Sequence, residues 1–147
     1  KPVWDATTAY FNGAGLDADT GYALAMVTQE LLENAVKYGH FGPSDQIRLE
    51  IQIRRRDVTI EVTHRVEPDE ARLKRLDLTI QWIRGFQNPF EAYVERLKAV
   101  SVATPQQGES GLGLVRIAYE GQSILDFYVN EHHELAVSAV HPLRSDH

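Results

Sequence analysis

The sequence contains no cysteine and little of several other residue types. Its 147 residues include no Cys, one Met and two Trp. Without cysteine the chain cannot form a disulfide scaffold or a thiolate metal site, and this composition suits a reducing compartment. We therefore expect a cytoplasmic protein.

Excess positive charge and long apolar runs are also absent. The formal net charge is -6 at pH 7, whereas a nucleic-acid-binding domain needs a clustered basic face. The one compact basic run, Arg54 to Arg56, falls at an expected hairpin turn, which favours a solvated loop. No stretch is apolar enough to span a membrane, so we expect neither nucleic acid nor membrane as a partner. The first residue is Lys1 rather than Met, so the sequence leaves open whether a segment precedes it.

The remaining composition is that of a globular protein, and its patterns predict the fold class. Apolar residues make up 43% of the chain, and the length suits a single domain over residues 1–147. Apolar spacing predicts helices over residues 18–39, 69–84, 90–100 and from 111 onward, and alternation predicts strand pairs over 47–62 and 124–140. This order predicts an α+β two-layer sandwich, with the helices on one face of a mixed, mostly antiparallel sheet.

A polar row follows the long helix predicted before residue 39. Its apolar stripe consists of Leu24, Val27, Leu31, Leu32, Ala35 and Val36. Glu30, Asn34 and Lys37 lie at i, i+4 and i+7 and therefore share one face. Taken alone, such a row is most often the solvated edge of an amphipathic helix.

A second segment, from Gly108 to Ala118, has glycines at the start of a predicted helix. Gly111 and Gly113 are poor helix formers, but a helix N-terminus with open backbone suits a phosphate group. Taken alone, the segment fits a tight turn better. Together, the two segments supply an oxygen ligand for Mg²⁺, backbone donors for phosphate and a base.

These segments resemble two motifs of one ATPase fold. The stretch ELLENAVKYG resembles the N box, and SGLGLVRIA the second glycine box, of the fold shared by gyrase, histidine kinases and anti-sigma-factor serine kinases (GHKL). The resemblance implies ATP and Mg²⁺ as cofactors, with Glu30 as general base and Asn34 as Mg²⁺ ligand. It further implies nucleotide contacts from Lys37, Gly108, Gly111, Leu112 and Gly113, under a lid formed by residues 101–110.

Within this fold, the chain is similar to the anti-sigma-factor serine kinase branch, and to kinases of a small anti-sigma-antagonist-like partner in bacterial biofilm signalling. The resemblance implies an ATP-dependent protein serine/threonine kinase that phosphorylates an anti-sigma-antagonist-like (STAS) protein. The alternative is a binding module that sequesters a sigma factor or antagonist without nucleotide turnover. A homodimer is compatible with both hypotheses.

The chain departs from the family pattern where an Asp normally binds the adenine amino group. The sequence there reads THRVEPDEA, with Thr63 or His64 at the expected position. Loss of this carboxylate predicts weak ATP binding and poor discrimination against GTP. His64 is either a substitute adenine contact or a surface histidine at a strand end.

Two other groups of residues have simpler interpretations. His132 and His133 are adjacent in a predicted hairpin, so they point in opposite directions and suit an exposed turn better than a metal site. Trp82, Phe86, Phe90 and Tyr93 are expected to pack two helices onto the domain. If they are exposed, a partner or dimer surface is favoured instead.

Overall fold

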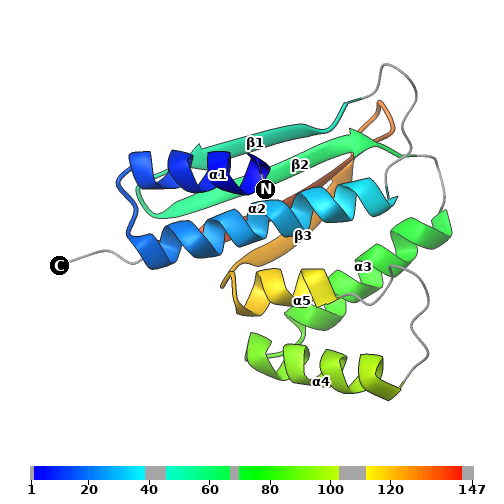
Figure 1. The fold of residues 1–147 in the computed structure, drawn as a ribbon. Helices are drawn as coiled ribbons and strands as arrows, with labels where there is room; N and C mark the ends of the chain where they lie inside the picture. The colour runs from blue at the N-terminus through cyan, green and yellow to red at the C-terminus, as the bar shows by residue number, and fades with distance from the viewer. Residues whose placement is uncertain (1, 39–45, 67–69, 103–111, 144–147) are drawn as a thin grey trace.

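The computed structural model describes residues 2–38, 46–66, 70–102 and 112–143. Helices α1 (Pro2–Gly13) and α2 (Ala18–Tyr38) precede strands β1 (Arg48–Ile53) and β2 (Asp57–Arg65). Helices α3 (Glu70–Arg84), α4 (Pro89–Val102) and α5 (Leu112–Tyr119) follow, and strands β3 (Ile124–Val129) and β4 (Glu134–Pro142) complete the order (Figure 1). Within these ranges, no helix is long and apolar enough to cross a membrane.

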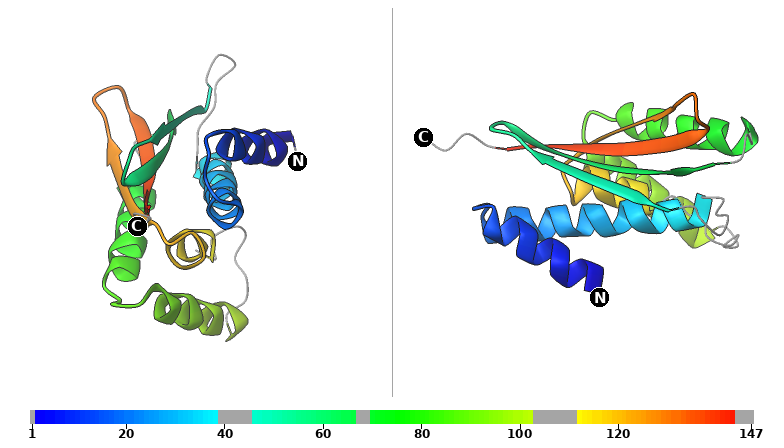
Figure 2. Two further views of the ribbon diagram at one scale, coloured as in Figure 1. Left: turned by 90° about the vertical axis from the view of Figure 1, so that its left-hand side faces the viewer. Right: turned by 90° about the horizontal axis from the view of Figure 1, so that it is seen from above.

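The four described strands form one sheet in the order β1-β2-β4-β3, and each neighbouring pair is antiparallel. The alternation of apolar residues sets the register, since Ile51 lies opposite Ile60 and Phe127 opposite Val137. Helices α1, α2 and α5 lie on the same side of this sheet (Figure 2). The predicted α+β sandwich is therefore confirmed, and its described strands are antiparallel throughout.

The core lies between the sheet and helices α2 and α5. Val58, Ile60 and Val62 alternate along β2 and are almost fully buried. The same core includes Leu24, Val27 and Leu31 of α2 and Val115 and Ile117 of α5. One prediction for the apolar stripe was wrong: Val36 is 66% exposed, because it lines an open hollow with Val3 of α1 and does not pack in the core.

Helix α2 begins where its capping residue predicts. The backbone N–H of Thr20 donates to Asp17 Oδ1 at 2.7 Å, which satisfies a donor that the first helical turn leaves open. The hydrogen bonds from Thr20 hold the pKa of Asp17 below its usual value. Further along α2, the buried Thr28 hydroxyl donates to the Leu24 carbonyl at 2.8 Å. The cap thus fixes the first residue of the helix that carries the polar row.

Helix α1 was not predicted from the sequence. Its buried side chains are Thr7 and Phe11, so the apolar periodicity is weak and packing on α2 stabilises the helix. Helix α4 also extends further than expected, because Ser101 and Val102, assigned to the lid, are helical. The remaining lid residues, 103–110, lie outside the described residues.

The aromatic residues of α3 and α4 are partly packed and partly exposed. Tyr93 stacks on Tyr119 of α5 with ring centroids 5.3 Å apart, and Phe86 packs against the core. Trp82 and Phe90 are 39% and 45% exposed. Packing of the inserted helices is therefore confirmed for Phe86 and Tyr93, while Trp82 and Phe90 also reach the surface.

Candidate functional site

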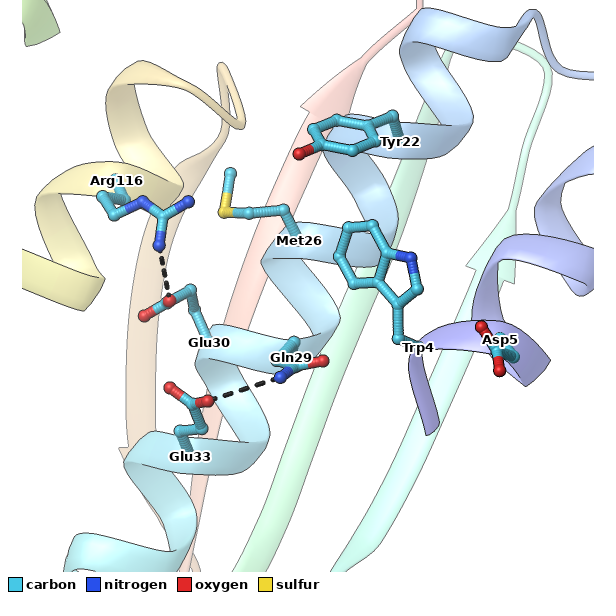
Figure 3. Close-up of a pocket in the computed structure, with 8 residues that line it drawn as sticks. All are labelled: Trp4, Asp5, Tyr22, Met26, Gln29, Glu30, Glu33 and Arg116. Carbon is cyan, nitrogen blue, oxygen red and sulfur yellow. Dashed lines mark hydrogen bonds and ion pairs between the residues drawn. The ribbon is translucent and has the colours of Figure 1, made fainter. Parts of the chain in front are cut away.

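Glu30 lies on the side of α2 that faces α5, and its carboxylate is held by an arginine. The Glu30 side chain is 14% exposed, and Arg116 Nη1 donates to Glu30 Oε1 at 3.0 Å (Figure 3). These two residues are 86 positions apart in the sequence. The packing of α5 against α2 therefore creates the contact.

A second carboxylate anchors the same arginine. The Arg116 Nε and Nη2 atoms donate to Glu120 Oε2 at 3.3 and 3.2 Å. Glu120 lies four residues after Arg116, directly beyond the last residue of α5, so this pair forms locally at the end of that helix. Sequence reasoning did not select Arg116. Its i,i+4 spacing to Glu120 was visible in the sequence, whereas its contact with Glu30 depends on the fold.

Gly113 provides room for the other oxygen of Glu30. A Cβ atom built on Gly113 would overlap Glu30 Oε2. The predicted contact between phosphate and the Gly113 backbone concerns a different group and stays a prediction; the Glu30 carboxylate lies at the Cβ position of this glycine. The glycine thus allows α5 to approach the proposed base closely.

The electrostatic surroundings of Glu30 shift the pKa of its carboxyl group. Burial raises the pKa of Glu30 above its usual value; Arg116 opposes this effect, Glu33 adds to it, and Lys37 opposes it. A carboxylate whose pKa is raised holds a proton more readily than an ordinary surface carboxylate. These surroundings are compatible with the predicted role of Glu30 as a general base, which stays a prediction.

Asn34 lies one turn beyond Glu30 on α2 and carries an unsatisfied polar atom. Its Nδ2 is buried and has no hydrogen-bond partner among the described residues. A buried amide left in this state costs about 1–3 kcal/mol, which makes Asn34 a candidate for contact with a bound group. The oxygen and nitrogen of an Asn amide exchange places by a flip, so the same position can present an oxygen.

This arrangement fits Mg²⁺ bound together with phosphate. Mg²⁺ commonly takes one or two protein oxygens and completes its shell with water and phosphate oxygens, so one amide such as that of Asn34 is sufficient. In the described part of the chain, no three His, Asp or Glu side chains cluster as a site bound only by protein would require.

A pocket of about 680 Å³ opens beside Glu30, between α1, α2 and α5. Its lining residues are Trp4, Asp5, Tyr22, Met26, Gln29, Glu30, Glu33 and Arg116 (Figure 3). The Trp4 and Tyr22 rings meet edge to face with centroids 5.2 Å apart. Glu30 thus forms part of the wall of a pocket that a group from solvent can enter.

A comparison with known protein families identifies the family of this chain. The model of the histidine kinase-like ATPase domain matches residues 1–119, which include α1 to α5 and the residues described above. The chain belongs to this family. A search of curated proteins gave no match.

The other residues predicted for nucleotide binding in this histidine kinase-like ATPase domain are only partly described. Lys37 is exposed near the end of α2, and Leu112 begins α5. Gly108 and Gly111 lie outside the described residues. Their contacts with a nucleotide therefore stay predictions.

Thr63 and His64 are both buried, but on opposite faces of β2. His64 is 1% exposed and follows the alternation of Ile60 and Val62, which places it on the helix side of the sheet. The alternative of a surface histidine was wrong, because the strand continues to Arg65 and keeps His64 covered. Thr63 faces away from α2 and α5, so of the two residues His64 is on the side of the domain that carries Glu30.

The surroundings of His64 favour its neutral form. Its Nδ1 donates to the Arg65 carbonyl at 3.0 Å, and burial lowers the pKa of His64 below its usual value. By contrast, His132 and His133 are exposed in the β3–β4 turn, as predicted.

Proposed function

We propose that this histidine kinase-like ATPase domain is an ATP-dependent protein serine/threonine kinase, which phosphorylates a regulatory partner of the anti-sigma-antagonist-like (STAS) type. The observation that carries the proposal is Glu30, a largely buried carboxylate with a raised pKa at the wall of an open pocket. A module that only sequesters its partner needs no such group.

In the proposed reaction, the partner's Ser or Thr hydroxyl enters the pocket and approaches Glu30. Its oxygen forms a bond to the γ-phosphorus of ATP while the bond between that phosphorus and the β–γ bridging oxygen breaks. Glu30 takes the hydroxyl proton, and ADP leaves with the bonding electron pair. When bound, Mg²⁺ would neutralise charge on the phosphates, and Asn34 would hold it.

Phosphorylation would then release the partner, because the new phosphate adds negative charge to a packed interface. The cytoplasm is the proposed compartment, and self-association into a homodimer is compatible with the scheme. These assignments rest on the resemblance to anti-sigma-factor serine kinases.

A second candidate function is sequestration of a sigma factor or antagonist without turnover. The observation that favours it is the missing adenine-binding Asp, since Thr63 and His64 stand at that position. Under either function, the absent carboxylate predicts weak ATP binding.

The test combines nucleotide binding with transfer of a labelled phosphoryl group. Calorimetry with ATP and Mg²⁺ should detect binding, and γ-³²P-ATP should label purified STAS-domain proteins in the presence of the wild-type chain. Glu30→Gln should keep the ATP affinity within about threefold but lower labelling by roughly a hundredfold, as expected for loss of a general base.

Glu33→Gln provides a matched control, because this exposed carboxylate lies on the same helix and lines the same pocket. Equal labelling by wild type and Glu30→Gln would exclude Glu30 as the base. Failure to bind either ATP or GTP at millimolar concentration would favour sequestration.

A further inference from the structure

We propose that Arg116 is a positioning residue for the proposed base, and that Glu120 holds Arg116 in place. This inference rests on the proposed function, in which Glu30 accepts the proton. It assigns a role to two charged residues outside the polar row of α2: Arg116 on α5 and Glu120 directly after that helix.

The contacts restrain both oxygens of the Glu30 carboxylate. Arg116 Nη1 contacts Oε1 at 3.0 Å, and Oε2 occupies the space left by the missing side chain of Gly113. A free glutamate side chain samples several rotamers, and general base catalysis requires one geometry. A donor on one oxygen and a close backbone on the other reduce that freedom.

The pair with Glu120 explains why the residue at position 116 is an arginine. The guanidinium group directs Nε and Nη2 towards Glu120 and leaves Nη1 for Glu30. Such a planar fork can bind two carboxylates at fixed angles, whereas a lysine ammonium acts as a single point charge. Lysine would keep the charge at this position but lose the geometry.

Other charged groups near Glu30 would remain when Arg116 is replaced. Glu33 and Lys37 act on Glu30 from α2, and Glu120 acts from the turn after α5. Asp5 of α1 lines the same pocket. Since Arg116 lowers the pKa of Glu30, its removal should raise that pKa further. The effect of Arg116 on the pKa of Glu30 and its effect on the position of the Glu30 carboxylate can therefore be measured separately.

The experiment compares Arg116→Gln and Arg116→Lys with wild type, with Arg54→Gln as a control for loss of an arginine in the β1–β2 turn. Transfer of the γ-phosphoryl group from MgATP to a purified STAS-domain protein gives kcat and KM for ATP. NMR follows the Glu30 carboxyl carbon and the Gly113 amide across a pH titration. We expect both Arg116 variants to keep KM within about threefold and to lose roughly tenfold to a hundredfold in kcat, the scale of a small misplacement. Arg54→Gln should match wild type.

The NMR measurement separates this proposal from the kinase assignment. In wild type, the Gly113 amide resonance should follow the titration of Glu30, and in Arg116→Gln this coupling should weaken even if the protein shows no turnover. Full kcat in Arg116→Lys would mean that the positive charge alone is sufficient and would overturn the positioning role. An unchanged response of the Gly113 amide in Arg116→Gln would overturn it as well. If Arg116→Gln does not fold, Glu120→Gln removes the anchor and should show the same weakened coupling.

Discussion

Glu30 of α2 occupies the space that a side chain at Gly113 of α5 would need. A glycine at the start of an ATPase helix is readily interpreted as room for phosphate. In this protein it is room for a carboxylate, and that carboxylate also binds Arg116. The glycine therefore sets the distance between two functional helices.

Gly113→Ala should leave the protein folded and lower phosphoryl transfer. The added Cβ displaces the flexible end of the Glu30 side chain, while alanine improves helix propensity by about 1 kcal/mol relative to glycine. Turnover should fall by roughly tenfold to a hundredfold, because the base is misplaced. Kinetics and thermal unfolding would be measured together.

Gly13→Ala is the matched control for this substitution, because a Cβ at Gly13 meets no atom within 4 Å. Combining Glu30→Asp with Gly113→Ala shortens the acidic side chain by one methylene. The double variant should therefore restore part of the contact between Arg116 and the carboxylate. Normal turnover in the single variant would show that Glu30 can move without functional cost.

Asn34→Ala should affect nucleotide binding far more than stability. Asn34 Nδ2 has no partner among the described residues, so alanine removes a buried polar group without breaking a hydrogen bond to that group. The melting temperature should stay near that of wild type, while affinity for ATP in Mg²⁺ falls about tenfold or more. Gln29→Ala on the same helix is the control, and a large loss of stability with normal binding would give Asn34 a structural role instead.

Glu30→Gln should change the pH dependence of stability. Burial raises the pKa of Glu30 above 4.5 in the folded protein, so the folded state binds more protons than the unfolded state between 4.5 and the raised value. Wild type therefore loses stability as the pH rises through this interval. Relative to wild type, the variant should gain stability across the same interval and then level off.

Urea unfolding between pH 4 and pH 8 would measure this difference. A relative stability that decreases with rising pH would contradict the assignment. It would show that attraction to Arg116 outweighs the cost of burying the Glu30 charge.

His64→Gln should reduce the loss of stability at acidic pH. Burial lowers the pKa of His64 below 6.5, so the unfolded chain takes up a proton before the folded protein does. Wild type should therefore lose stability as the pH falls from about 6.5 towards the folded-state pKa. Denaturant unfolding at several pH values should give a shallower slope for the variant, whereas His132→Gln, at a side chain 75% exposed, should keep the wild-type slope.

The sheet was predictable because its signal is local. Alternating apolar residues placed Leu125, Phe127 and Val129 against Ala139, Val137 and Leu135, and the observed register contains these pairs. Helix α1 was not predictable in the same way, since few of its side chains are buried. Its stability comes from contact with α2, which apolar spacing within α1 does not encode.

The site was predictable in part for the same reason. Glu30 and Asn34 share one helical face, which spacing alone reveals. The bond between Glu30 and Arg116 joins residues 86 positions apart, and the burial of His64 depends on how far β2 extends. Both features arise from tertiary packing, so they required the structure.

The dependence of Glu30 on a single short helix restricts where the chain can change length. Gly113 and Arg116 are three residues apart on α5, which has eight residues. An α-helix turns by about 100° per residue, so one residue inserted between them would rotate Arg116 away from α2. In the β3–β4 turn, by contrast, Glu131 and His132 are exposed and contribute no side chain to the core. Insertions should therefore be tolerated in the hairpin, whereas insertions within α5 should break the contact between Arg116 and Glu30. The same restriction should hold for natural variants and for engineered fusions.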